Sequence, residues 1–140
     1  MYQKVIIIGN LGRDPEMRYM PDGKAVTTLS VATNKSWTDQ ASGERKEQTT
    51  WFRVSVWGRQ AEVANEYLSK GRQVLVEGEL RPDPQTGGPR TFTRQDGTVG
   101  ASYDLRAFNV RFIGGRDTAG FDTGPASEGS AAQEEEEIPF

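Results

Sequence analysis

The sequence predicts an all-β fold: a five-stranded Greek-key barrel with one short helix between strands 3 and 4, followed by a disordered acidic tail. Alternating β-branched runs separated by Gly, Pro and Asp clusters predict the strands, and a single helical pattern interrupts them. At Gly114-Gly115 the composition changes to Gly, Ser, Ala, Thr and acids. We therefore expect a folded domain at 1–113, a flexible linker at 114–133 and an acidic tip at 134–140.

The first three strands are expected in the N-terminal half of the domain. Residues 4–11, KVIIIGNL, form a short apolar run that leads into a Gly-Arg-Asp-Pro turn cluster. After a Pro-Asp-Gly turn within 20–23, residues 25–37 and 48–58 are two alternating β-branched runs. Because 39–45 has the composition of a loop tip, these two runs predict a long hairpin.

The helix and the last strands follow. Strands are expected at 73–80 and 102–113, with a hairpin arm around Asp96-Gly97 between them, while three prolines and two glycines exclude regular structure from 81–90. The resulting order of five strands, with the helix after the third, is that of the OB-fold, which binds oligonucleotides on its strand 2–3 face. A helix is predicted at 60–71 because apolar residues recur at helical spacing before Lys70-Gly71: Ala61, Ala64, Tyr67 and Leu68.

The composition excludes several classes of function. The chain has no cysteine and no histidine, which removes disulfides, thiolate metal sites and every nucleophile that relies on histidine. Two acid pairs, Asp14/Glu16 and Glu77/Glu79, fit a turn and a solvent face better than a metal site. We therefore predict no catalytic residue, no metal and no cofactor. No secretory signal and no membrane-length apolar run is visible, so we expect a cytoplasmic protein without a membrane partner.

The net charge of −3 is unevenly distributed along the chain. Residues 1–113 hold 16 basic and 13 acidic residues, a charge of +3, whereas 114–140 hold one arginine and seven acids, a charge of −6. A mildly basic domain that carries an acidic tail indicates that the domain has an anionic partner.

The most informative stretch is WFRVSVWGR, residues 51–59. An arginine in a core would need a partner, so the face of this strand that carries arginine is predicted to be the outer one. Exposed indoles beside cations suit single-stranded nucleic acid, because each base stacks on an aromatic ring for roughly 1–3 kcal/mol and the cations neutralise phosphates. Because side chains alternate along a strand, one face carries the apolar residues Phe52, Val54 and Val56. The other face, which includes the arginine, carries Trp51, Arg53, Ser55 and Trp57.

Two more stretches repeat this combination. Lys35-Ser36-Trp37 ends the preceding strand, and Arg90-Thr91-Phe92-Thr93-Arg94 places an aromatic ring between two arginines. The cations that do not adjoin aromatic strands fit a solvated surface: Arg13, Arg18, Lys24, Arg72, Arg106 and Arg111. The candidate DNA-binding residues are the aromatics and the cations beside them or at strand ends: Trp37, Trp51, Trp57, Phe92, Lys4, Lys35, Arg53, Arg59, Lys70, Arg81, Arg90 and Arg94.

Taken together, KVIIIGNLGRDPEMRYMPDGKAV, SGERKEQTTWFRV, AEVANEYLSKGRQVLVEGELR and the final EEEEIPF resemble the bacterial single-stranded DNA-binding proteins of the homotetrameric type. The likeness covers nearly all of residues 3–113. It implies an OB-fold, four copies per assembly, a place on the nucleoid and single strands bound without sequence preference. Phe52 would lie at a subunit contact, and the stacking aromatics would be Trp37, Trp51, Trp57 and Phe92. Two departures are the insertion RPDPQTGGPR before RTFT, and Phe92 where the family has the larger Trp.

The chain ends in an acidic run with an apolar tip, which a disordered segment cannot bury by itself. From the residues alone, a peptide held by a partner and a solubilising end with a chance apolar finish are equal alternatives. The resemblance implies the first: enzymes of DNA replication, recombination and repair would bind the tip through a hydrophobic pocket with a basic rim. The residues concerned are Glu134, Glu135, Glu136, Glu137, Ile138, Pro139 and Phe140.

Two other function classes remain open on the sequence. An OB-fold binder of structured RNA, or a primosomal accessory protein, would prefer RNA or form a dimer. A pure protein-interaction adaptor would bury its tryptophans, and long-wavelength indole emission quenched by single strands would argue against it. An enzyme comes last, since the chain lacks histidine and cysteine.

Overall fold

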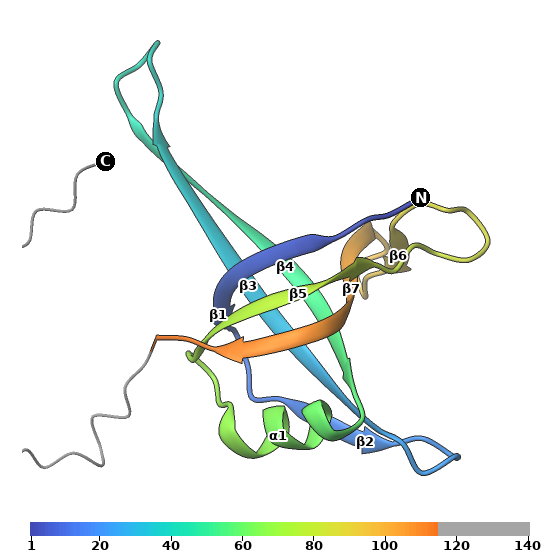
Figure 1. Cartoon of the computed structure of the whole chain (residues 1–140). Coiled ribbons are helices and arrows are strands. Elements are labelled where there is room, and N and C mark those ends of the chain that lie inside the picture. Colours follow the sequence, from blue (N-terminus) through green and yellow to red (C-terminus); the bar gives the residue numbers. More distant parts are fainter. Residues whose placement is uncertain (115–140) are drawn as a thin grey trace, which may run out of the picture.

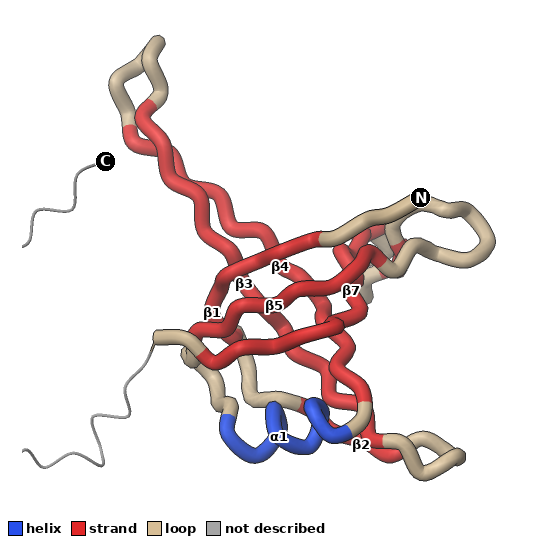
Figure 2. Tube along the Cα trace, viewed as in Figure 1, coloured by secondary structure: helices blue, strands red, loops and turns tan. Residues whose placement is uncertain are grey.

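The computed structural model describes residues 1–114 and shows a barrel from which a long two-stranded arm projects (Figures 1 and 2). Apart from Gly114, the linker and tip predicted at 114–133 and 134–140 lie outside the described residues. The elements are, in chain order, β1 (Val5–Leu11), β2 (Glu16–Tyr19), β3 (Ala25–Thr38), β4 (Arg45–Trp57), α1 (Arg59–Tyr67), β5 (Gln73–Leu80), β6 (Arg90–Thr93) and β7 (Val99–Phe112).

Within residues 1–114, five strands close the barrel in the order β1–β5–β7–β4–β3, and β3 pairs with β1 to complete the ring. β4 and β7 run parallel, while the other barrel neighbours are antiparallel. The short helix α1 follows β4, the third barrel strand, and lies below the barrel in the view of Figure 1. The predicted all-β OB-fold with its helix after the third barrel strand is therefore confirmed.

Two short strands extend this barrel. β6 pairs with β7, and the backbone N–H of Arg94 donates to the carbonyl of Thr98 at 2.8 Å, which confirms the hairpin arm expected around Asp96-Gly97. β2 pairs with β3 through a turn in which Gly23 has φ 86°. The sequence analysis did not predict β2, because four residues are too few to reveal a period of two.

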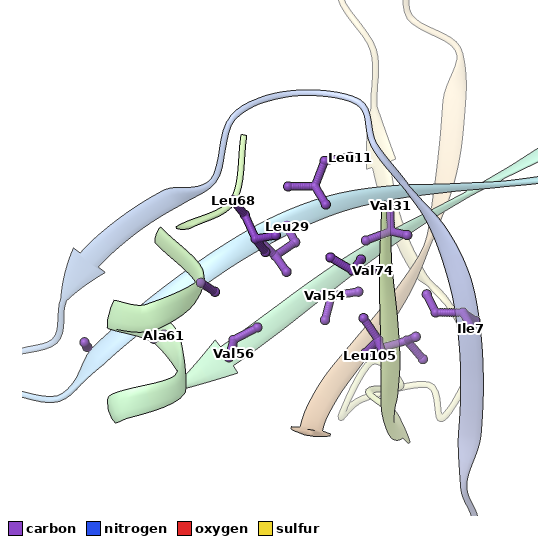
Figure 3. Close-up of a cluster of buried hydrophobic side chains, with 13 residues drawn as sticks. Ile7, Leu11, Leu29, Val31, Val54, Val56, Ala61, Leu68, Val74 and Leu105 are labelled. Atoms are coloured by element: carbon purple, nitrogen blue, oxygen red, sulfur yellow. The ribbon is translucent and has the colours of Figure 1, made fainter. Parts of the chain in front are cut away.

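The barrel core explains the alternation of β4 and the spacing of α1. Val54 and Val56 are buried, and Figure 3 shows them beside Leu29, Val74 and Leu105. These apolar side chains fill the barrel interior, so the opposite face of β4 is turned outward.

On α1, the buried apolar positions are Ala61 and Ala64, with Leu68 just after the helix. Tyr67, predicted to share their face, is instead 60% exposed. Positions 61, 64 and 68 follow the i, i+3, i+7 stripe of a helix, and residue 67 lies to one side of it.

The barrel closes where β1 meets β3, through the register pairs Asn10↔Ala32 and Leu11↔Val31. Gly9 lies against this seam, and a Cβ atom placed on it would overlap the carbonyl oxygen of Ala32. The absence of a side chain at Gly9 is therefore what allows the two strands to approach so closely. Among residues 1–114, no helix is long and apolar enough to cross a membrane.

Candidate nucleic-acid interface

A groove of about 590 Å³ runs over the outer face of β3 and β4 and reaches β6 and β7. We call it the aromatic groove. It brings together four residues that the sequence analysis named from two separate stretches: Trp51, Arg53, Arg90 and Phe92. The hydroxyl-bearing residues Thr28, Ser30 and Ser102 also line it.

The outward placement of these groups follows from the β3–β4 register. Arg53 lies opposite Ser30, and Trp51 lies opposite Ala32, so small side chains of β3 face large ones of β4. Trp51 is 54% exposed and Arg53 is exposed as well, as the alternation of β4 predicted. The adaptor alternative, which requires buried tryptophans, therefore fails for Trp51.

Both aromatic rings of the groove rest against a glycine. A Cβ on Gly12 would overlap the six-membered ring of Trp51, and a Cβ on Gly100 would lie 2.6 Å from Cζ of Phe92. Phe92 and Gly100 are direct partners in the β6–β7 ladder. Each ring is thus supported from one side by bare backbone while remaining about half exposed, which pre-organises it for stacking.

Cations lie beside the exposed rings. The guanidinium of Arg94 lies 5.5 Å from the centroid of the Phe92 ring, and its Nη1 donates to the carbonyl of Val99 at 3.2 Å. The ammonium of Lys35 lies 5.7 Å from the centroid of Trp37. These distances fall within the range of cation–π attraction, so a positive charge is held beside each of these exposed rings.

Arg90 is held by a carboxylate under the groove. Its Nε lies 3.8 Å from Oδ2 of Asp104, and the hydroxyl of Ser102 donates to Oδ1 of that carboxylate at 2.7 Å. The Asp104 side chain is only 12% exposed, whereas that of Arg90 is 56% exposed. The guanidinium is therefore positioned by a mostly buried acid and remains open to solvent.

The arm formed by β3 and β4 carries Trp37 and Lys35 beyond the groove (Figure 1). Trp37 is 40% exposed, so burial is excluded for it too. Its ladder partner is Lys46, whereas Trp51 pairs with Ala32, and the odd spacing between 46 and 51 puts the two indoles on opposite faces of the ladder. The register therefore gives the arm an exposed indole on each of its two faces.

The tip of this arm is fixed by local bonds. Asp39 forms an ion pair with Lys46 at 3.0 Å and accepts hydrogen bonds from the N–H of Ala41 and the hydroxyl of Ser42. These contacts hold the pKa of Asp39 below its ordinary value. The bond with Lys46 has the largest effect, and the two hydrogen-bond donors add to it. At the end of the β6–β7 hairpin, the hydroxyl and N–H of Thr98 lower the pKa of Asp96 in the same way. Both turns therefore hold their acids in the charged form.

Several predicted residues lie outside the aromatic groove. Trp57 is half-buried at the far end of β4, opposite Val26. The ammonium of Lys4 forms an ion pair with Glu77 of β5 at 3.2 Å. Arg59 begins α1 and borders a different hollow with Val110 of β7. Their contact with DNA stays a prediction.

Lys70 and Arg81 also lie outside the groove. The backbone N–H of Lys70 donates to Oδ1 of Asp14 at 2.8 Å, and Arg81 borders a hollow beside the loop after β5. Two of the four acids that the sequence analysis considered as metal ligands therefore have structural partners. Glu77 pairs with the ammonium of Lys4, and Asp14 accepts from the backbone N–H of Lys70. Oε1 of Glu16 lies 3.9 Å from Nη1 of Arg13. Among residues 1–114, no cluster of three or more aspartate or glutamate side chains could hold a metal ion.

Two cations that sequence reasoning assigned to solvated surface lie beside predicted site residues. Arg13, assigned to solvated surface, lines the aromatic groove. Arg18 pairs in register with Val26, which itself pairs with Trp57, so it lies in the same row as that indole. Recognising that Glu16–Tyr19 and the Pro-Asp-Gly turn begin a hairpin would have placed Arg18 beside β3, whereas Arg13 precedes that hairpin.

Phe52 lies on the other side of β4, as predicted. It is half-buried, packs against the core cluster and contacts Tyr103, with ring centroids 5.8 Å apart and ring planes at 43°. Its edge reaches the aromatic groove as well. Its role at a subunit contact stays a prediction.

An OB-fold barrel whose outer strand face carries supported, exposed aromatic rings together with arginines and hydroxyls belongs to the class that binds single-stranded nucleic acid by stacking. The chain also matches the model of the family described as "Single-strand binding protein family" over residues 2–113, and it belongs to this family.

Two solved structures are similar to the chain. One is the Plasmodium falciparum SSB in complex with ssDNA, with a TM-score of 0.66 and 26% identity, covering 81% of this chain and 97% of that one. The other is a deletion mutant of the single-stranded DNA binding protein from Thermus aquaticus, with a TM-score of 0.60 and 32% identity. The match to it covers 81% of this chain and 51% of the Thermus chain.

Proposed function

We propose that this protein binds single-stranded DNA without sequence preference and is not an enzyme. The observation that carries the proposal is the aromatic groove, in which Trp51 and Phe92 are exposed, backed by glycines and accompanied by Arg53 and Arg90. Membership of the single-strand binding protein family and likeness to a structure in complex with ssDNA support it.

The mechanism is stacking combined with phosphate neutralisation. Every base has a π-face, so a ring such as Trp51 accepts any base for roughly 1–3 kcal/mol, and no base edge needs to be read. Arg53, Arg90 and Arg13 surround the same groove and can each replace a counterion on a phosphate. On the arm, Trp37 with Lys35 extends this surface to a second face of the hairpin.

In the cell, such binding would protect single strands during replication, recombination and repair, in a nucleoid-associated, cytoplasmic setting. The tip at 134–140 would recruit the enzymes of these processes through its glutamates and its Ile-Pro-Phe end. The recruiting role rests on the chemistry of the sequence and on the family resemblance.

Assembly into a homotetramer is part of the proposal. Ile6 and Ile8 of β1 are 56% and 51% exposed, and Phe108 of β7 is 49% exposed. Apolar side chains on an outer sheet face are the kind of surface that a second copy covers. Light scattering of the full chain tests this: a mass near four chains supports it, and a mass of one chain refutes it.

A fluorescence titration tests single-strand binding. We expect an oligothymidine to quench the tryptophan emission strongly, because Trp51 and Trp37 are exposed. Raising the salt concentration should weaken the complex, because phosphates bound by arginine release counterions. A duplex and an RNA oligomer of equal length are the controls. An equal response to duplex, or a preference for structured RNA, contradicts the proposal.

The charge difference between domain and tail gives a further prediction. A domain of +3 attracts a tail of −6 when DNA is absent, so the tail competes for the groove. Deleting residues 134–140 should tighten single-strand binding at low salt, leave it unchanged at high salt and abolish capture of partner enzymes. A matched variant with Glu134–Glu137 replaced by glutamine separates charge from the apolar tip. Unchanged affinity at low salt in both variants refutes the competition.

A further inference from the structure

A second hollow lies beside the loop at 81–90, which follows β5. Figure 1 shows this loop projecting at the right. It measures about 240 Å³, below the roughly 300–1,000 Å³ of pockets that enclose a drug-sized ligand. Its walls are mainly apolar and include Leu80, Pro82, Pro89 and Tyr103. A hollow of this size and character suits one flat ring system, such as a nucleobase.

Tyr103 offers an aromatic ring to this hollow and was not among the predicted DNA-binding residues. It is 55% exposed although it stands on β7 in register with Phe52 of β4. The Phe52 ring supports it at a centroid distance of 5.8 Å. An exposed ring supported from one side has the property that Trp51 and Phe92 show in the aromatic groove, where glycine provides the support.

The loop opposite Tyr103 is an ordered wall. The N–H of Arg81 donates to the carbonyl of Asp104 at 2.7 Å, which anchors the loop to β7 directly after Tyr103. Asp83 closes the loop on itself: its N–H donates to the carbonyl of Gly88, and its carbonyl accepts from the N–H of Gly87, both at 2.8 Å. Gly87 and Gly88 both line the hollow, and a Cβ on Gly87 would meet nothing within 4 Å, so the wall is bare of side chains at these two residues.

The hollow continues the aromatic groove. Ser102 lines both, and the Arg90–Asp104 ion pair joins a residue of the groove to a residue of the hollow. Phe92 lies opposite Gly100, three residues before Tyr103, which is roughly 10 Å along a strand, and this odd spacing puts Tyr103 on the other face of β7. Arg81 and Arg90 flank the ends of the inserted loop, so positive charge is available for phosphates on both sides. Ser102, which lines both, is where a strand bound at Phe92 would cross to the hollow, so its next bases are the groups placed to enter.

We propose that Tyr103 and the loop at 81–90 form an additional base-binding subsite, in which a nucleobase of single-stranded DNA stacks on Tyr103 beside the bare glycine wall. The subsite rests on the proposed single-strand binding and extends the groove across the insertion. It uses a residue that the sequence pattern could not select, because Tyr103 occupies the inner-face position of β7, in register with Phe52.

Titration of full-length variants with oligothymidines of increasing length tests the subsite. Tyr103→Leu should weaken binding of long oligomers about 5-fold or more, whereas Tyr103→Phe, which keeps the π-face, should bind like the wild type. Short oligomers that end at Phe92 should not distinguish the variants. Tyr67→Leu is the matched control, since Tyr67 is 60% exposed on α1 and borders neither hollow.

Crosslinking of the wild type provides a second readout that no folding defect can affect. Irradiation with an iododeoxyuridine-substituted oligothymidine should attach bases to Tyr103 or to residues 82–89. Binding by the wild type with no crosslink there and no loss in Tyr103→Leu refutes the subsite alone, whereas no binding by the wild type refutes the proposed function. If Tyr103→Leu instead loses binding of a peptide of residues 134–140 and keeps DNA affinity, the hollow is a peptide site and the subsite is refuted.

Discussion

Replacing Trp51 by alanine is expected to weaken single-strand binding by roughly 5- to 150-fold, the equivalent of the 1–3 kcal/mol that one stacked base contributes. The indole is 54% exposed, lines the aromatic groove together with Arg53 and rests against Gly12. Because its six-membered ring is already supported, little ordering is needed when a base stacks on it. Anisotropy titration with a labelled oligothymidine at fixed salt measures the change.

A second variant tests the support rather than the indole. Gly12→Ala keeps every DNA-contacting group, but its Cβ would overlap the Trp51 ring, so the ring must move. We expect a loss of affinity in the same direction as Trp51→Ala and smaller in size. Tyr67→Ala, which removes an exposed ring from α1, should have no effect. Wild-type affinity in Trp51→Ala would show that the groove is not where bases stack.

The sequence predicted those features that depend on one segment at a time. The period of two in β4 places Trp51 and Arg53 on the outer face whatever the rest of the barrel does. The short arm around Phe92 likewise follows from its own turn at Asp96-Gly97. Since strand identity and face are local properties, the all-β fold and half of the groove are predictable from the amino-acid sequence alone.

Features that depend on pairing between segments are not predictable in this way. Trp37 faces away from Trp51 because the β3–β4 register, set at the turn after residue 38, pairs Trp37 with Lys46. Lys4 forms its ion pair with Glu77 only because β1 and β5 become neighbours. Arg13 reaches the groove because the backbone N–H of its neighbour Gly12 donates to the carbonyl of Ser30 on β3. In each case the deciding partner lies on another element.

The glycines show most clearly that contacts between elements cannot be predicted from the sequence. Sixteen glycines occur in the chain, and the sequence distinguishes only those in turn clusters. The fold adds a different requirement at Gly9, Gly12 and Gly78, where a Cβ atom would overlap a carbonyl oxygen or an indole of another element. These positions do not have the positive φ of turn glycines, so only close approach explains them.

Gly9→Ala is accordingly expected to destabilise the fold by about 3 kcal/mol or more, at the upper end of what overpacking costs. The overlapping atom is the backbone oxygen of Ala32, which cannot rotate aside as a side chain can, and Cγ1 of Val31 would lie 2.8 Å from the new methyl group. The seam has only two register pairs, so moving β1 away from β3 opens the barrel. Urea unfolding of the full chain at fixed protein concentration measures the loss.

Gly88→Ala is the matched control, because the only neighbour its Cβ would meet is the Thr86 hydroxyl at 3.6 Å and its φ is not positive. Its stability should stay within about 0.5 kcal/mol of the wild type. The comparison isolates close approach, since both variants add the same methyl group and remove the same backbone freedom from the unfolded chain. If Gly9→Ala were as stable as Gly88→Ala, β1 and β3 could not be in the contact that closes this barrel.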